Sequence, residues 1–193
     1  MQVTRGRRET PILRSRKCVF LSHCLLAQTV RANGVAKYFP AAVKPLVQWC
    51  LDNDINMIQM PCPELLCAAG GLGREPHGKV WYERNGLRET SRPIAIGRAA
   101  YAKQLLEAGC TVLAVIGMEF SPACAPTYLN KGRRLYKDKG IYIEELYEEL
   151  RKVGLEMPFV GINQRALTKL KRDLDQLLPP ILPALAQRGA ANR

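Results

Sequence analysis

The chain has 193 residues and a net charge of +12 at pH 7, with 47% hydrophobic and 24% charged residues. This composition is typical of a globular domain and excludes collagen, a coiled coil and a wholly disordered chain. No apolar run reaches the roughly 18 residues that a membrane-spanning helix needs, and the N-terminus has no apolar stretch of signal-peptide length. We therefore expect a single domain located in the cytoplasm.

The basic charge is concentrated near the ends of the chain. Residues 1–17 carry six basic side chains and one acidic one, and two more arginines lie within residues 181–193. We expect a basic, mobile N-terminal segment over 1–17, a folded domain over 18–180 and a mobile tail over 181–193. A basic surplus attracts nucleic acid or other anions. Because much of this surplus lies on the ends, it is a weak argument for an RNA-binding module.

Short apolar runs alternate with longer amphipathic segments along the chain. The pattern predicts four strands, over 18–22, 55–60, 111–117 and 158–162. It also predicts four helices, over 41–51, 94–108, 141–153 and 163–178, so that a helix follows each strand. We place Pro93 near the first turn of the helix over 94–108.

Strands that alternate with helices imply βαβ units and a parallel sheet. We expect an α/β fold, a single-domain three-layer Rossmann-like sandwich with a mostly parallel sheet of four or five strands. Two long connections, over residues 63–92 and 121–140, are expected to be functional loops.

Seven cysteines are present, and with no export signal they indicate metal binding or catalysis rather than a disulfide framework. Cys24, Cys62 and Cys124 follow the first three predicted strands. Parallel strands place their carboxyl ends, and hence the ligand site, at one edge of the sheet, so we expect these three cysteines to converge. Cys18 and Cys50 fit core positions instead, and Cys110 is expected to begin a core strand.

Three thiolates are soft ligands that suit an iron–sulfur cluster or zinc, and three rather than four would leave one metal position open. The alternative is three ordinary core residues, because free cysteine is often buried. A zinc site that adds His23 is a further possibility. We favour His23 as part of the pocket wall, because adjacent residues at a strand end point in opposite directions.

Two polar residues accompany these cysteines. Glu64 lies two residues after Cys62, and Ser121 lies three residues before Cys124. A carboxylate beside a cluster can move a proton, and a hydroxyl can bind a substrate heteroatom. The alternatives are a first-turn acid at a helix start for Glu64 and a turn or cap residue for Ser121.

Three segments together resemble the TudS family of thiouracil desulfidases (DUF523-like). The family pattern has S-x-C-L-L-G after the first strand, then C-P-E followed by G-G-L, and later G-x-S-P-x-C. This chain has SHCLL, CPELLCAAGGL and GMEFSPAC in the same order. The resemblance covers residues 18–124 and is closest to a TudS-related branch of desulfidases. The family's C-R-Y-D-G and GGLP-x-PR segments read VRANG and GGLGREP here.

The resemblance implies a [4Fe–4S] cluster held by Cys24, Cys62 and Cys124, with a fourth iron free to take the sulfur of the substrate. It assigns Glu64 as a catalytic acid and Ser121 as a substrate-binding or proton-relaying hydroxyl. The implied substrate is a small thiolated base or nucleoside, or a thiolated uridine in tRNA. The alternatives are a non-catalytic iron–sulfur or zinc protein that carries sulfur or senses metal, and an RNA-binding module.

Overall fold

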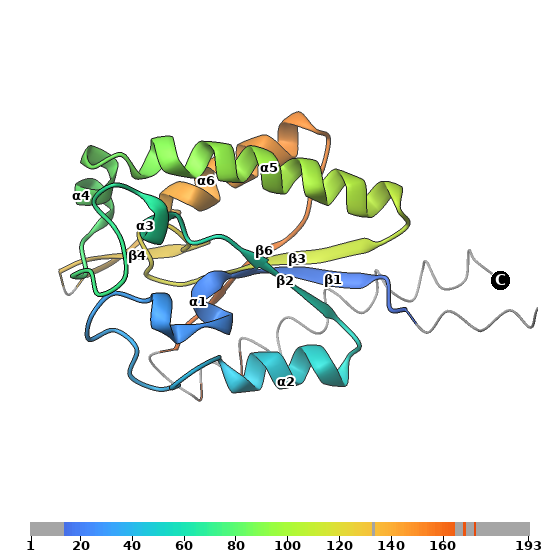
Figure 1. Cartoon of the computed structure of the whole chain (residues 1–193), viewed down its shortest axis with the longest axis horizontal. Coiled ribbons are helices and arrows are strands. Elements are labelled where there is room, and N and C mark those ends of the chain that lie inside the picture. Colours follow the sequence, from blue (N-terminus) through green and yellow to red (C-terminus); the bar gives the residue numbers. More distant parts are fainter. Residues whose placement is uncertain (1–13, 133, 165–167, 169–171, 173–193) are drawn as a thin grey trace, which may run out of the picture.

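The computed structural model describes residues 14–132, 134–164, 168 and 172. Its centre is a four-stranded parallel sheet in the order β2-β1-β3-β6 (Figure 1). The strands are β1 (Lys17–Ser22), β2 (Asn56–Met60), β3 (Thr111–Met118) and β6 (Phe159–Ile162). These are the four strands that the sequence predicts, each with bounds shifted by no more than one residue.

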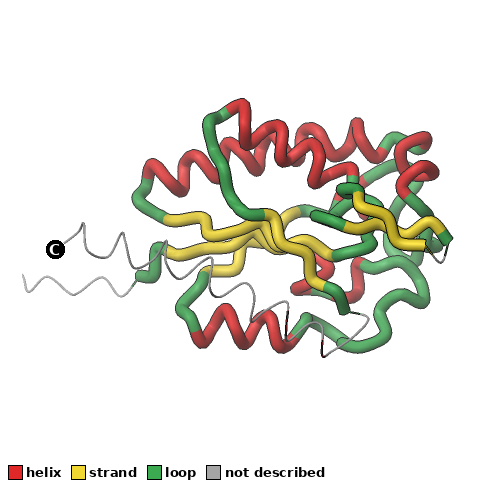
Figure 2. The backbone as a smooth tube through the Cα atoms, turned by 180° about the vertical axis from the view of Figure 1, so that it is seen from behind, coloured by secondary structure: helices red, strands yellow, loops and turns green. Residues whose placement is uncertain are grey.

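Helices cover both faces of this sheet. Figures 1 and 2 show α5 (Leu87–Glu107) and α6 (Ile141–Lys152) on one face and α2 (Lys44–Asp52) on the other. The three layers confirm the expected α/β sandwich. The described helices contain no segment long and apolar enough to span a membrane.

The sheet is buried on both faces, and β1 shows why its sequence is almost continuously apolar. Phe20 packs with the core under α5 and α6, whereas Val19 and Leu21 pack with the core above α2. Each of these three side chains is fully buried. A strand buried on both faces needs apolar residues at odd and even positions alike, which is the pattern of a parallel sheet.

The order in which strands are added to the sheet reverses beside β1, because β2 pairs with one edge of β1 and β3 with the other. The connection from β1 to β2 runs through α2 on one face, and the connection from β2 to β3 runs through α5 on the other (Figure 1). Such a switch point opens a crevice at the carboxyl ends of the strands. Short helices follow two of these ends, α1 (His23–Leu26) after β1 and α3 (Pro63–Leu66) after β2.

The helix expected over 94–108 begins earlier than the sequence predicts. It starts at Leu87, directly after Gly86 in the left-handed conformation, and Pro93 lies inside it. The buried positions Leu87, Ser91, Ala95 and Ala99 recur every four residues, so one continuous stripe faces the core. Pro93 itself is exposed. Core packing across the whole stripe therefore outweighs the hydrogen bond that this proline cannot donate.

The two connections expected as long loops contain regular elements. Residues 63–92 include α3, α4 (Lys79–Arg84) and the start of α5, and residues 121–140 include a hairpin of β4 (Tyr128–Lys131) and β5 (Arg134–Lys137). Leu129 is the one fully buried side chain among the described residues of this hairpin. With so little apolar periodicity, the sequence carries no strand signal there.

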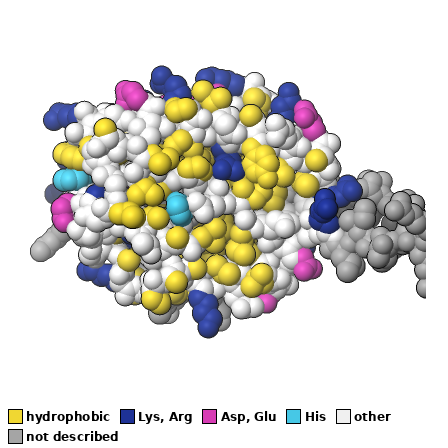
Figure 3. Space-filling view, in the orientation of Figure 1, with side chains coloured by type: hydrophobic (Ala, Val, Ile, Leu, Met, Phe, Trp, Pro, Cys, Tyr) yellow, Lys and Arg dark blue, Asp and Glu magenta, His cyan; other side chains and the backbone are white. Residues whose placement is uncertain are grey.

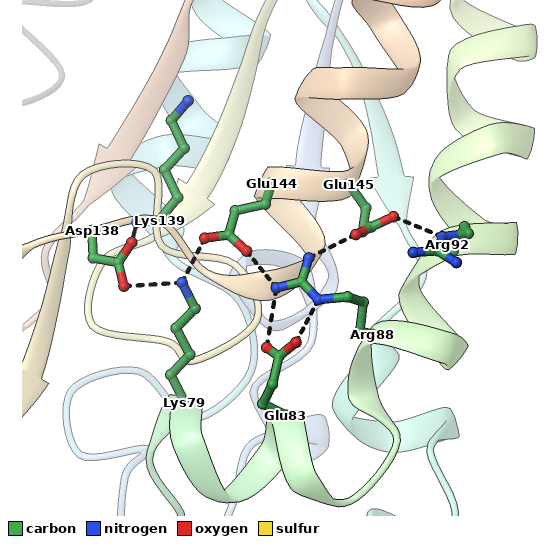
Figure 4. A network of polar contacts seen from close by, with 8 residues as sticks. All are labelled: Lys79, Glu83, Arg88, Arg92, Asp138, Lys139, Glu144 and Glu145. Atoms are coloured by element: carbon green, nitrogen blue, oxygen red, sulfur yellow. Dashed lines mark hydrogen bonds and ion pairs between the residues drawn. The ribbon is translucent and has the colours of Figure 1, made fainter.

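An ionic network connects α4, the start of α5, α6 and the end of the hairpin (Figure 4). Lys79 lies 2.9 Å from Asp138 and 2.5 Å from Glu144, and Arg88 contacts both Glu144 and Glu145. Most of these side chains are partly exposed, so each single pair contributes little stability. The network fixes where α4 and the hairpin stand relative to α6.

On the face drawn in Figure 3, most described Lys and Arg side chains stand around the rim, and hydrophobic side chains spread across the middle. Within the described residues, this face therefore carries no continuous basic surface.

The predicted N-terminal segment over 1–17 and tail over 181–193 lie outside the described residues, apart from 14–17. The helix predicted over 163–178 is described only at 163, 164, 168 and 172.

We predict that Pro93→Ala stabilises the protein. The alanine restores an N–H that can bond the carbonyl of Glu89, and it removes a residue that costs about 3 kcal/mol inside a helix. The unfolded chain regains some entropy, so we expect a net gain of about 1–2 kcal/mol in the free energy of unfolding. Urea denaturation measures it. A loss of stability would show that packing of α5 depends on a bend at Pro93.

Candidate functional site

A cavity of about 660 Å³ opens at the carboxyl ends of β1, β2 and β3. Cys24, Cys62 and Cys124 all line it, although 38 and 62 residues separate them along the chain. The expected convergence of the three cysteines on one cavity is therefore observed. Glu64 and Ser121 line the same cavity.

The local structure of each strand end sets the position of its cysteine. Cys24 is the second residue of α1, and its carbonyl accepts a hydrogen bond of 2.5 Å from the side chain of Gln28. Cys62 is the N-cap of α3, and Pro63 follows it at the first helical position, where proline is favoured. Cys124 lies in the turn that follows β3.

Two glycines allow the Cys124 turn to pack closely against its neighbours. A Cβ on Gly117 would lie 2.2 Å from the carbonyl oxygen of Cys124, and a Cβ on Gly140 would lie 2.4 Å from that of Ala123. The first N–H groups of α6 bind the same turn, because Tyr142 N donates to the carbonyl of Ala123 at 3.0 Å. The start of α6 thus holds the Cys124 turn in place through backbone hydrogen bonds.

Burial raises the pKa of the three thiols. The pKa of Cys24 rises to about 12 and that of Cys62 to about 11, and the pKa of Cys124 lies well above its usual value. Repulsion from Cys62 also raises the pKa of Cys24, and repulsion from Cys62 and Cys24 raises the pKa of Cys124. Arg31 and Arg74 partly offset this effect at Cys24 and Cys62. Three buried thiolates therefore require a cationic partner.

The cavity thiols are soft donors that suit an iron–sulfur cluster or zinc. Among the described residues, no group of three or more His, Cys, Asp or Glu side chains is placed to hold one metal ion. His23 lies in the cavity wall, as expected.

Ser22 provides a second observation that fits a cluster. Its hydroxyl is buried, has no conventional hydrogen-bond partner among the described residues, and lowers the pKa of the Cys124 thiol. A hydroxyl next to a ligand sulfur is the kind of group that tunes a cluster.

Glu64 and Ser121 are directly bonded to each other. The Ser121 hydroxyl donates to Glu64 Oε1 at 2.9 Å and accepts from the backbone N–H groups of Cys124, at 3.0 Å, and Ala123, at 3.3 Å. Glu64 is only 8% exposed. Ser121 bonds the backbone of its turn and Glu64 lies in the first turn of α3, as the alternative interpretations of these two residues predict. Both residues also line the cavity.

Sequence reasoning missed Arg74, which reaches Glu64 Oε2 at 2.9 Å. Two donors, Arg74 and Ser121, therefore point at Glu64, which accepts from both as a carboxylate. Tyr82, Lys79 and Gln164 also line the cavity and were not singled out. The basic residue after three glycines in AAGGLGRE was the available signal for Arg74, but the pattern gave no indication of its partner.

The remaining cysteines lie outside the set that lines this cavity. Cys18 and Cys50 are buried in the two cores, as expected. Cys67 is also buried, and its thiol faces the backbone carbonyl of Glu64 at 3.7 Å. Cys110, expected to begin a core strand, instead lies just before β3 and is partly exposed.

Comparisons with known proteins add one sequence relative and one solved structure. No family model matches the chain. An uncharacterized protein of Methanocaldococcus jannaschii is 24% identical over 168 residues, which cover 86% of this chain and 99% of that protein. A solved structure, the [4Fe-4S]-dependent thiouracil desulfidase TudS, is 19% identical with a TM-score of 0.40 and covers 83% of this chain and 99% of that one. This solved structure bears the name of the family that the three motifs resemble.

We predict that Gly140→Ala weakens the Cys124 turn. The added Cβ would meet the backbone of Ala123 and Cys124, which cannot move aside without shifting the cysteine. We expect the free energy of unfolding of the apoprotein to fall by about 1–3 kcal/mol, as measured by urea denaturation. Gly97→Ala is the control, because a Cβ there meets nothing within 4 Å. A Gly140→Ala protein as stable as wild type would contradict this account of the turn.

We predict that the cavity thiols of the apoprotein react slowly with iodoacetamide at pH 8. With a pKa of about 12 for Cys24 and about 11 for Cys62, only about one in 10,000 and one in 1,000 of these groups is a thiolate at that pH. The rate should rise about tenfold per pH unit between pH 7 and 10, as followed by mass spectrometry. A plateau below pH 9 would show that burial does not raise these pKa values.

Proposed function

We propose that the protein is a desulfidase that replaces the sulfur of a thiocarbonyl group by oxygen. The proposed substrate is a thiolated nucleobase or a related compound, and the proposed cofactor is a [4Fe–4S] cluster held by Cys24, Cys62 and Cys124. The observation that carries this proposal is the single cavity in which three cysteines face a bonded pair of acid–base groups, Glu64 and Ser121.

The cluster, when bound, would supply an open iron that takes up the departing sulfur and polarises the thiocarbonyl bond. The other steps fall to groups of this chain. The reaction adds water across the carbon and releases sulfide, so R₂C=S and H₂O become R₂C=O and H₂S. A base must take a proton from water as its oxygen bonds to carbon, and an acid must return protons to the sulfur.

Glu64 is the base in this proposal. It accepts hydrogen bonds from Arg74 and Ser121 in the resting state, so it is ready to accept a proton rather than to donate one. Once protonated by the attacking water, it can return that proton to the leaving sulfur. This order refines the role of catalytic acid that the family resemblance implies, because the same carboxylate acts first as base and then as acid.

Ser121 connects the carboxylate to the Cys124 turn. Its oxygen accepts two backbone N–H groups, so its single hydrogen is directed at Glu64. In this proposal Ser121 relays a proton between Glu64 and the substrate, or donates to a substrate heteroatom when the carboxylate is protonated.

A non-catalytic iron–sulfur protein is the main alternative. Such a protein needs the three cysteines but has no need for a buried carboxylate directed at the same cavity. The dedicated contacts of Glu64 therefore favour an enzyme. A thiolated uridine in tRNA remains a second candidate substrate within the desulfidase proposal, because the cavity opens at the surface.

We predict that Glu64→Gln keeps the cluster but lowers turnover by about 100-fold or more, since an amide cannot accept the proton. Reconstituted wild type and variant are compared anaerobically for sulfide release from 2-thiouracil, 4-thiouridine and thiolated tRNA. Glu107→Gln, which changes an exposed glutamate at the end of α5, is the control. Wild-type turnover with an equally fast Glu64→Gln enzyme would assign the proton to another group.

A further inference from the structure

Arg74, in the cavity wall, forms hydrogen bonds through every nitrogen of its guanidinium group. Its Nη2 contacts Glu64 at 2.9 Å, its Nε donates to the Tyr82 hydroxyl at 3.2 Å, and its Nη1 donates to the carbonyls of Val30, at 2.8 Å, and Gly71, at 3.1 Å. All three guanidinium nitrogens are therefore in use. The Arg74 and Glu64 side chains are only 6% and 10% exposed.

We propose that Arg74 is a positioning residue that fixes the Glu64 carboxylate in its proton-accepting geometry. The inference rests on the proposed desulfidase function and deepens it. Arg74 is not itself a proton donor in this scheme, because a guanidinium stays protonated. It acts through Glu64.

The two oxygens of Glu64 have separate partners. Arg74 holds Oε2, and Ser121 donates to Oε1. Because Arg74 Nη2 holds Oε2 and the Ser121 hydroxyl bonds Oε1, the orientation of the carboxylate is set at both oxygens, and Oε1 stays directed at Ser121 and the cysteine turn. A displacement of about 1 Å at such a group can cost 100-fold in rate. The clamp therefore sets the distance between the base and the cysteines.

Only an arginine can make this set of contacts. The four partners belong to the short helix after α1 (Gln28–Val30), the first turn of α3, the glycine loop that follows α3, and α4. A lysine would keep the charge opposite Glu64 but has one nitrogen and no planar fork. The guanidinium thus connects the segments that carry Val30, Gly71 and Tyr82 to the carboxylate of Glu64.

A purely structural ion pair is the competing explanation. Buried ion pairs add little net stability, because desolvation opposes the attraction between the charges, whereas removing one partner alone is costly. Both explanations therefore predict that Arg74→Gln destabilises the apoprotein and that the double variant Arg74→Gln, Glu64→Gln recovers part of the loss. They differ in what happens to turnover at full cluster loading.

The first measurement is a thermal denaturation cycle on the apoprotein, which needs neither cluster nor substrate. We expect Arg74→Gln to lower the Tm by about 5 °C or more. The double variant should lose less than the sum of the two single losses. Arg92→Gln is the control, because Arg92 is 60% exposed and does not line the cavity, and its partner Glu145 stays paired with Arg88, so the Tm should change little. Additive losses in the double variant would overturn the clamp.

The second measurement is steady-state sulfide release per intact cluster. We expect Arg74→Gln to lower kcat by about 10- to 100-fold, with KM changed little and the cluster absorption near 400 nm retained. Arg74→Lys, which keeps the charge, should recover most of the Tm but only part of kcat. If kcat falls no further than the iron content does, Arg74 is a structural ion pair and the inference is wrong.

The two measurements separate this inference from the proposed function. A wild-type protein with a full cluster and no turnover on any thiolated substrate would overturn the proposed function and the catalytic role of Arg74 together. The thermal cycle would still show whether Arg74 clamps Glu64. Wild-type turnover together with an unaffected Arg74→Gln enzyme would overturn the positioning role alone.

Discussion

The site depends on the parallel pairing of β1 with both of its neighbours. β2 and β3 run alongside β1 in the same direction, so all three strands end at one edge of the sheet. Whatever follows each strand must then meet at that edge. No short spacing motif is needed, and none is present, because the sheet itself brings together cysteines that are 100 residues apart at the extremes.

The electrostatics of that edge impose a second requirement. Three buried thiols with raised pKa values and one buried carboxylate cannot all ionise without positive charge nearby. Arg74 supplies it for the carboxylate, and a cluster would supply it for the thiols. In the proposed enzyme, the cavity would therefore hold two charge-compensated centres, one built from Glu64 and Arg74 and one from the three cysteines with the cluster. Ser121 joins them, because it bonds both Glu64 and the backbone of Cys124.

The strands and the convergence of the cysteines could be predicted from sequence, since buried parallel strands are continuous apolar runs and the topology follows from their alternation with helices. The start of α5 could not, because the proline rule favoured Pro93 as a first-turn residue, whereas a buried stripe that begins at Leu87 carries the helix through it. The β4–β5 hairpin was missed because its strands are short and mostly exposed. Arg74 was missed because its four partners lie at four places in the chain, and only the fold shows them together.

The most direct test is the iron and acid-labile sulfide content of anaerobically reconstituted protein, compared between wild type and two cysteine variants. Cys62→Ala removes a cavity thiol, and Cys50→Ala removes a fully buried thiol from the core above α2. The account predicts roughly four iron atoms and four sulfides per chain in wild type and Cys50→Ala, and a large loss in Cys62→Ala. Wild-type protein that takes up no iron, or a Cys62→Ala variant that retains the full amount, would contradict it.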